Sequence, residues 1–190
     1  MKNQLLFLFS FLLLATACKK KDTPAPATPA NPYYFKFTFN GTSSNFNSNQ
    51  PQYMPFNANE IGGYQGSGQL NLYPSVGLRL TWPSNDTVKE SDVMGLVGKT
   101  LYFSDTTITP ELTWDKDAPG TDSWISVDTF NTSYSVKITN VAFLKKDTTL
   151  GYYVRTYVIT GTCSALMTDL TKTSIFSGGS FNFIISRRDL

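Results

Sequence analysis

The stretch YFKFTFNG, residues 34–41, decides the class of the fold. Phe35, Phe37 and Phe39 alternate with other residues, so in an extended chain all three side chains point to one face. Asn40 and Gly41 follow at once, and this pair is the strongest short signal for the tight turn of a β-hairpin. The stretch therefore predicts a strand with an aromatic face that turns directly into a partner strand.

The same alternation recurs toward the C-terminus, with turn residues between the segments. Near Asn140 the apolar phase slips by one position, because Val141 and Phe143 take over as the apolar set; such a slip predicts a β-bulge. The other expected strands have their inward residues at Leu70 and Leu72; at Leu78, Leu80 and Trp82; at Leu112 and Trp114; at Tyr134, Val136 and Ile138; in the β-branched run 152–165; and at Phe181, Phe183 and Ile185.

Residues 90–97 are the one stretch that we expect to form a helix, of a turn or two, with Ser91 as its cap. Gly178 and Gly179 are expected to break the chain before its last strand. Eight or more short strands, without helices for parallel crossovers, predict an all-β domain over residues 33–190. We expect an antiparallel β-sandwich or, alternatively, a partly open barrel.

The composition excludes several classes of function. The chain of 190 residues contains no histidine, which removes His-based triads, histidine general bases and imidazole zinc ligands. From Asn31 onward it has 12 basic and 13 acidic side chains, so no basic face for nucleic acid is expected. Hydrophobic residues make up 41% of the chain, enough to fill one core.

Residues 1–17 are typical of a signal peptide. Lys2 precedes an apolar run, Leu5–Leu14, that is about half the ~20 residues needed to span a bilayer. The small residues of 15–17 suit a leader peptidase, and Cys18 follows directly. Either the thiol of Cys18 is lipidated after cleavage, or an ordinary peptidase releases a soluble periplasmic protein. We expect lipidation, because an exported protein seldom keeps a lone thiol at its first residue.

This leader resembles those of bacterial lipoproteins, in which the cysteine receives diacylglycerol and becomes the mature N-terminus. It departs from the usual box, since Ala15 occupies the position three before Cys18 that leucine commonly takes. The CKKKD start and the Pro/Thr/Ala tether of residues 18–32 are similar to lipoproteins of the Bacteroidetes. Lys19 is not the aspartate that retains such proteins in the inner membrane, so the resemblance implies a lipid-anchored outer-membrane protein.

The closing pattern, ITGTCSA at 159–165 and SGGSFNFIISR at 177–187, resembles small Bacteroidetes lipoproteins in which two final hairpin strands complete a β-sandwich. The resemblance implies no functional residues. Cys163 lies in this segment and is expected to be a buried thiol rather than a nucleophile, because no histidine exists to activate it.

The densest group of carboxylates is in residues 114–122. Asp115, Asp117 and Asp122 could supply oxygen ligands to calcium, although the spacing is not that of an EF-hand. The alternative is a solvated hairpin tip, where Asp, Pro and Gly serve turn geometry. The same acids are the candidates for a glycoside-hydrolase carboxylate pair, a use that a flexible tip does not favour.

A ligand-binding face is expected from aromatic side chains. Trp124 would be exposed if Ile125 faced the core, and Tyr153 and Tyr157 would form a stripe with Arg155 between them. Flat rings of this kind suit the faces of sugars. The alternative is that these rings pack at the rim of the core or under loops.

Three threonines, Thr87, Thr106 and Thr148, each follow an aspartate in segments expected to lie between strands. This pattern resembles O-glycosylation sites of the Bacteroidetes. The alternative is that Asp and Thr favour turns by bonding to their own backbone.

The function expected from the sequence is a lipid-anchored envelope lipoprotein, non-catalytic and without a cofactor, that acts as a binding or structural module. Its partners are the membrane, through the lipid on Cys18, and either a glycan or an envelope protein. The alternative is a glycan-binding accessory lipoprotein of a polysaccharide uptake system that uses Trp124 and the tyrosines. An enzyme that works with acids alone is the third hypothesis.

Overall fold

The computed structural model describes residues 32–47, 57–66, 73–83, 87–117, 122–149 and 152–189. Contacts divide the chain into residues 1–30 and 31–190, and every described residue belongs to the second unit. The expected signal peptide, Cys18 and the strand expected around Leu70 and Leu72 lie outside the described residues. Among those described, no helix is long and apolar enough to cross a membrane.

The described residues form strands and a single short helix. In chain order the elements are β1 (Tyr34–Phe39), β2 (Thr42–Asn47), β3 (Glu60–Gly66), β4 (Ser75–Thr81), α2 (Glu90–Met94), β5 (Thr100–Tyr102), β6 (Thr109–Asp115), β7 (Ser123–Ser126), β8 (Ser135–Thr149), β9 (Tyr152–Thr168) and β10 (Thr173–Asp189).

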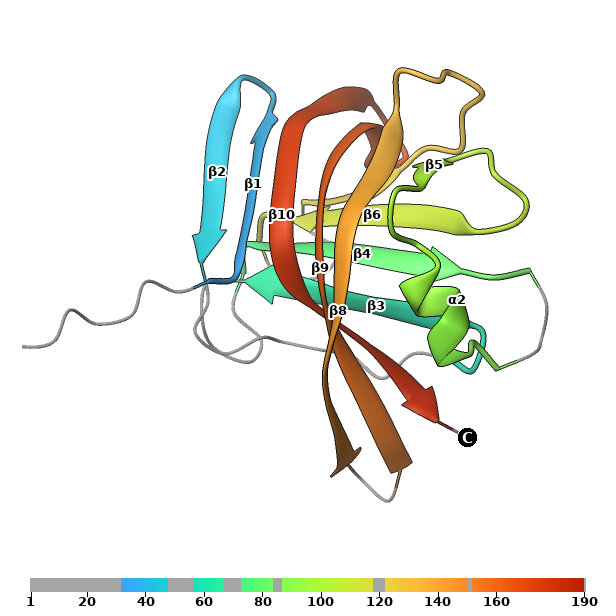
Figure 1. Cartoon of the computed structure of the whole chain (residues 1–190). Coiled ribbons are helices and arrows are strands. Elements are labelled where there is room, and N and C mark those ends of the chain that lie inside the picture. The colour runs from blue at the N-terminus through green and yellow to red at the C-terminus, as the bar shows by residue number, and fades with distance from the viewer. Residues whose placement is uncertain are drawn as a thin grey trace, which may run out of the picture. The chain divides into compact units, whose positions relative to one another are not determined.

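All strand pairs are antiparallel, in the order β2-β1-β10-β3-β4-β6-β7-β9-β8-β5, and β9 also pairs with β10. This extra pairing folds the sheet into two layers, β2-β1-β10-β9-β8-β5 and β3-β4-β6-β7. The layers join where Ser186 of β10 meets Gly62 of β3 and where Thr168 of β9 meets Ile125 of β7. The strands of the second layer run across those of the first (Figure 1). The predicted antiparallel all-β fold is confirmed.

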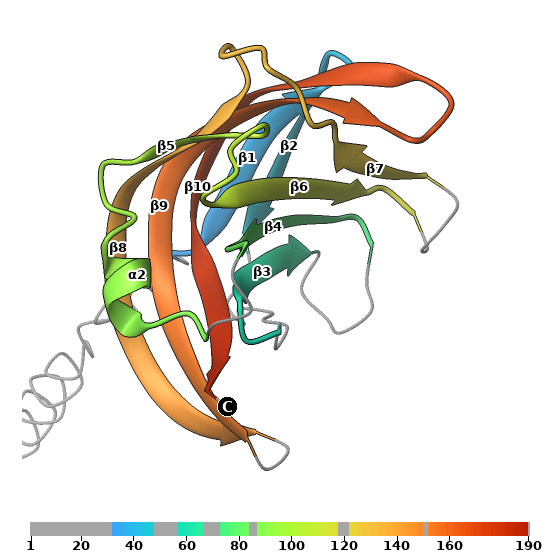
Figure 2. The same ribbon diagram turned by 90° about the vertical axis from the view of Figure 1, so that its right-hand side faces the viewer.

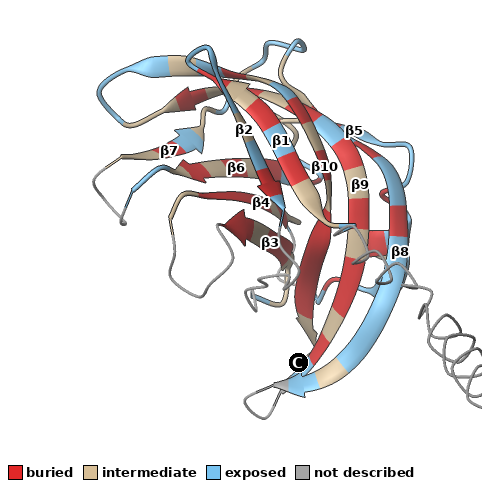
Figure 3. Ribbon diagram, turned by 90° about the vertical axis from the view of Figure 1, so that its left-hand side faces the viewer, coloured by how far each residue is buried: buried red, intermediate tan, exposed pale blue. Residues whose placement is uncertain are grey.

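The hairpin expected at residues 34–41 forms as predicted. Asn40 and Gly41 both have positive φ, 50° and 75°, as a tight hairpin turn requires. Phe35, Phe37 and Phe39 are buried on the inner face of β1. Buried residues alternate with more exposed ones along β1 and β9, as the period of a strand dictates (Figure 3).

Aromatic rings fill the space between the layers. Phe37 stacks on Phe176 with ring centroids 4.3 Å apart, and it meets Trp114 of the opposite layer edge-on at 5.0 Å. Phe35 contacts both Phe181 and Phe183 at 5.4 Å. Offset and edge-on pairs add to the stabilisation that burial of the rings already gives.

Two glycines on β9 and β10 make room for large neighbours. Gly161 lies directly opposite Phe181, and Gly179 lies opposite Cys163. A Cβ atom on Gly161 would lie 2.6 Å from Cζ of Phe181 and closer still to the carbonyl oxygen of Lys137. The phenylalanine ring therefore covers a position that only glycine can occupy.

The expected break at Gly178 and Gly179 is wrong. β10 continues through both residues, and the ladder to β9 only shifts its register between Phe176 and Gly179. Gly178 has a φ of 61°, which suits glycine at such an irregularity. The glycines bend the strand instead of ending it.

The bulge expected at Asn140 is confirmed, because the β8–β9 register shifts between Ile138 and Asn140. A second shift, between Phe143 and Lys145, was not predicted. The helix cap expected at Ser91 is wrong. The helix begins at Glu90, so Lys89 takes the cap position and Ser91 lies inside the helix; the N–H of Lys89 donates to Oδ2 of Asp92 over 2.8 Å.

We predict that Gly161→Ala lowers the free energy of unfolding by at least about 2 kcal/mol, because the added methyl group overlaps the Phe181 ring and a backbone carbonyl. Chemical denaturation measures the change. Thr162→Ala, on the exposed face of the same strand, is the matched control and should change stability little. Equal stability of the two variants would contradict the close packing at Gly161.

Candidate functional site

A cavity of about 690 Å³ lies where β9 and β10 meet the segment before α2. Residues from three parts of the chain line it: Thr87, Val88, Lys89, Glu90, Tyr153, Arg155, Arg187 and Asp189. In Figure 2, α2 lies against the curved β8–β9–β10 layer, and the segment before it is tied to β10 because Arg187 donates to the carbonyl oxygen of Val88. The volume of the cavity falls within the range found for small-ligand sites.

Strand register places three cations side by side next to this cavity. Lys146 of β8 is opposite Arg155 of β9, and Arg155 is opposite Arg187 of β10. We call Lys146, Arg155 and Arg187 the cation row. Like charges directly opposite each other on neighbouring strands are destabilising, so the row requires anionic partners.

Asp189 is the common partner of the cation row. Its carboxylate accepts a hydrogen bond from Nε of Arg155 over 2.9 Å, and pairs with Nη2 of Arg187 at 2.7 Å and Nζ of Lys146 at 3.7 Å. Burial alone would raise the pKa of Asp189, but the hydrogen bond from Arg155 and the nearby cations outweigh it and hold the pKa below its usual range. Glu90 forms a second ion pair with Nη1 of Arg155.

Arg187 is held deep in the wall of the cavity. Its side chain is only 7% exposed, and its Nη1 donates to the carbonyl oxygen of Val88. The buried hydroxyl of Tyr157 lies beside the guanidinium of Arg187, but neither this hydroxyl nor Nε of Arg187 has a hydrogen-bond partner of good geometry among the described residues. Burial raises the pKa of Tyr157, and the interaction with the side chain of Arg187, together with its positive charge, partly offsets that effect.

The mouth of the cavity is more exposed to solvent than the wall at Arg187. Tyr153 is 56% exposed, and Nζ of Lys146 lies 4.1 Å from the centroid of its ring. Arg155 has a side-chain exposure of 27% and so can reach both the cavity and its two carboxylate partners. The arrangement combines a buried guanidinium, a more accessible one and an exposed ring.

The structure brings together only part of the predicted ligand-binding set. Tyr153 and Arg155 line the cavity, whereas Tyr157 is fully buried behind it and contacts Phe143 with ring centroids 5.6 Å apart. The expectation that Tyr157 lies on an exposed stripe is wrong, because its side chain belongs to the buried hydrophobic core.

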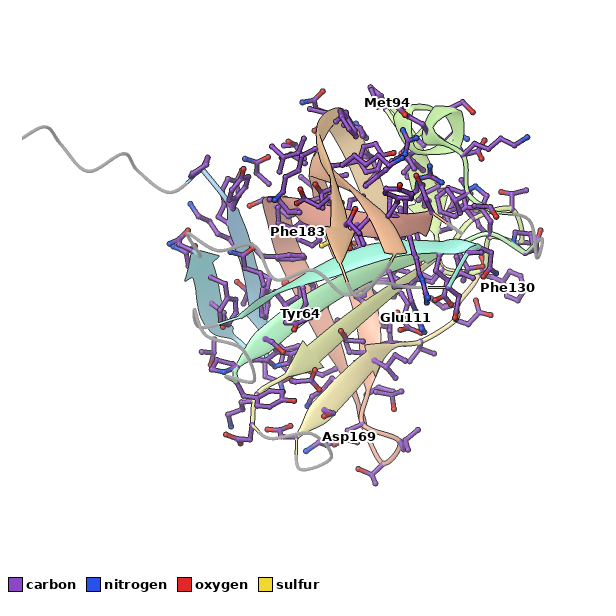
Figure 4. The ribbon with its side chains drawn as sticks, turned by 90° about the horizontal axis from the view of Figure 1, so that it is seen from below. Tyr64, Met94, Glu111, Phe130, Asp169 and Phe183 are labelled. Carbon is purple, nitrogen blue, oxygen red and sulfur yellow. The ribbon has the colours of Figure 1, made fainter. Side chains whose placement is uncertain are left out.

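The expectation that Trp124 is exposed is also wrong. Trp124 is 4% exposed, packs edge-on against Phe39 at 4.9 Å, and donates from Nε1 to Oδ1 of Asp122 over 2.6 Å. Its neighbour Ile125 faces solvent instead, with 38% exposure. Trp124 lies near the Thr168 end of β9, opposite to the cavity end; Asp169 and Met94, labelled in Figure 4, mark the two ends.

The carboxylates of Asp115, Asp117 and Asp122 do not form a metal site in the described residues, which contain no group of three or more His, Cys, Asp or Glu side chains placed to hold a metal ion. Asp122 instead bonds to Trp124 and pairs with Lys116 at 3.5 Å. These contacts lie where β6 and β7 approach each other; residues 118–121 lie outside the described residues, so the turn interpretation of the loop stays a prediction.

Thr87, Thr106 and Thr148 are all exposed. Thr87 and Thr106 lie in connecting segments as expected, but Thr148 is inside β8, so its expected place between strands is wrong. Their glycosylation stays a prediction. Cys163 is the buried thiol that was predicted, and burial raises its pKa far above the usual range.

The sequence interpretation missed Arg187, Asp189 and Glu90. A signal for Arg187 was present, because it continues the inward phase of Phe181, Phe183 and Ile185. A charged residue at an inward strand position needs a buried partner or a ligand. No comparable signal pointed to Glu90, which reaches the site from a distant helix.

No protein-family model, no curated protein and no solved structure matches the chain. Assignment of the site therefore rests on its own geometry and charge. At the cavity, a volume suited to a small ligand coincides with accessible charged side chains.

We predict that Asp189→Asn lowers the free energy of unfolding at pH 7 by about 2 kcal/mol, because it leaves the buried Arg187 without its carboxylate. A carboxyl whose pKa is lowered by folding contributes stability above its unfolded pKa, near 3.9, and loses it as pH falls through the folded pKa. The difference between wild type and variant should therefore shrink below about pH 4.

Urea denaturation at neutral and acid pH measures this dependence. Asp128→Asn, at an exposed position outside the cavity, is the control and should change little at either pH. A stability difference for Asp189→Asn that is the same at both pH values would contradict the proposed role of the carboxylate.

Proposed function

We propose that this chain is an exported, lipid-anchored envelope protein that binds a ligand in the cavity between Thr87 and Arg187 and catalyses no reaction. The observation that carries the proposal is the cavity of about 690 Å³, whose charged lining is held by ion pairs between the neighbouring strands β9 and β10. Sites built on strands hold ligand-binding groups more accurately than sites on loops.

Binding is favoured over catalysis because the ionisable groups are engaged with one another. Asp189, with its lowered pKa and its cationic partners, is a weak proton acceptor. Cys163 is buried and its pKa is raised, so it is a poor nucleophile. These properties suit groups that position a ligand.

The anchor is proposed from the sequence. Cys18 follows a short apolar leader, and residues 18–32 form a proline-rich tether that could extend about 40 Å from the lipid. One acyl chain binds a membrane only marginally, whereas two or three give a stable attachment. Lys19 favours the outer membrane, following the lipoprotein resemblance.

A glycan-binding accessory role is the second candidate. Of the three aromatic side chains that the sequence predicts to contact a sugar, Trp124 and Tyr157 are buried and only Tyr153 is exposed. The exposed ring of Tyr153 lies at the mouth of the cavity, where a sugar face could stack on it. The competing partner, an envelope protein, would not need a cavity of this size.

We predict that Cys18→Ser abolishes lipid attachment in a diderm bacterial host, because serine offers no thiol for diacylglycerol. The wild-type protein should partition into detergent and carry acyl chains on its N-terminal peptide by mass spectrometry. Cys163→Ala is the matched control and should keep the lipid, since that thiol is buried. A wild-type protein with a free thiol at residue 18 that stays in the aqueous phase would rule out the anchor.

We predict that Thr87→Trp blocks ligand binding by filling the mouth of the cavity. The full chain in detergent is screened against oligosaccharides and small organic acids, and a ligand retained by the wild type should be lost by this variant. Thr106→Trp is the control, because Thr106 is equally exposed but is not part of the cavity lining. The binding proposal fails if nothing is retained, or if both variants retain the ligand alike.

A further inference from the structure

The cavity carries an excess of positive charge. Three cations line it, Lys89, Arg155 and Arg187, against the two carboxylates of Glu90 and Asp189. Lys146, the third member of the cation row, lies next to the cavity and also pairs with Asp189. Asp189 is shared among all three members of the row. One carboxylate therefore serves three cations, of which Arg187 is buried.

Burial makes the charge of Arg187 costly. Arg187 is 7% exposed and shares its carboxylate partner, Asp189, with Arg155 and Lys146. Its Nε is a buried donor that no described residue accepts with good geometry. Arg155, the cross-strand neighbour, donates from Nε to Asp189 and from Nη1 to Glu90, which leaves its Nη2 for a further partner. The pair offers unused N–H groups beside a cavity.

We propose that the cavity binds a ligand through a carboxylate that pairs with Arg155 and Arg187; the proposal rests on the binding function argued above. A planar guanidinium matches a carboxylate with two parallel hydrogen bonds. An entering carboxylate would neutralise the excess charge of the cation row. A water molecule could accept hydrogen bonds from the two guanidinium groups, but it carries no negative charge to neutralise them.

The neutral part of the ligand is specified by the rest of the lining. The exposed Tyr153 ring gives the mouth an aromatic surface, and Thr87 adds a hydroxyl. A volume of about 690 Å³ accommodates one or two sugar rings. A sugar acid, with its carboxylate at the arginines and a ring face at Tyr153, satisfies both ends of the cavity.

Titration calorimetry of the full chain in detergent tests the proposal with matched probes: digalacturonate, its methyl ester, and citrate. We expect digalacturonate to bind and its uncharged ester to bind at least about tenfold more weakly, because the ester cannot form the charged pair. Tighter binding of citrate than of digalacturonate would support carboxylate recognition and identify the source as a small organic acid.

Arg155→Gln should weaken digalacturonate binding by about tenfold or more. It is preferred to Arg187→Gln because the more exposed Arg155 is less critical for folding, and circular dichroism verifies the fold of each variant. Arg79→Gln is the control. Arg79 is also a strand arginine paired with carboxylates, Glu60 and Glu111, but it lies outside the cavity.

The outcomes separate this inference from the proposed function. Equal binding of the acid and its ester, unaffected by Arg155→Gln, would overturn carboxylate recognition while leaving a binding module. Binding of neutral saccharides alone, lost in Thr87→Trp, would do the same. If none of the three probes binds at millimolar concentration, the inference is overturned, and failure of the wider screen would then remove the binding function as well.

Discussion

The contact of the Phe181 ring with Gly161 is the constraint on which the rest of the structure depends. It exists only if β9 and β10 pair in one register, since a shift by one residue would turn every side chain of a strand to the opposite face. The same register that places Phe181 over Gly161 places Arg187 beside Arg155, six residues further along the chain. The core and the cavity are therefore consequences of a single pairing.

The two ends of this long hairpin carry opposite chemistry. At the end next to β7, Phe176 and Trp124 pack in the aromatic core. At the other end, where β9 begins and β10 finishes, the inward positions hold Arg155, Arg187 and Asp189. A row of cations beside a core weakens the fold unless carboxylates or a ligand compensate it. Natural sequences agree with the rules of packing and charge over most of a fold and depart from them mainly at functional positions. A loss of stability of this kind therefore points to a site.

Local patterns in the sequence were enough to predict the hairpin at Asn40 and Gly41, the bulge at Asn140 and the all-β class, because turn chemistry and side-chain alternation act over a few residues. The corners that join the two layers could not be predicted, since they depend on contacts between strands distant in the chain. For the same reason Trp124 was assigned to the wrong face: its strand is only four residues long, and the alternation within it fits either orientation. At the site, Tyr153 and Arg155 were found from their spacing, but Glu90 and Asp189 are partners set by the fold.

The register of β9 and β10 tests the central claim most directly, and nuclear Overhauser contacts between backbone protons of the two strands measure it. The structure requires contacts that pair Phe181 with Gly161 and Arg187 with Arg155, with one interruption between Phe176 and Gly179. An upfield shift of the Gly161 α-protons, from the Phe181 ring, should accompany them. Contacts displaced by one residue, with Phe181 opposite Thr160 or Thr162, would contradict both the core and the cavity described above.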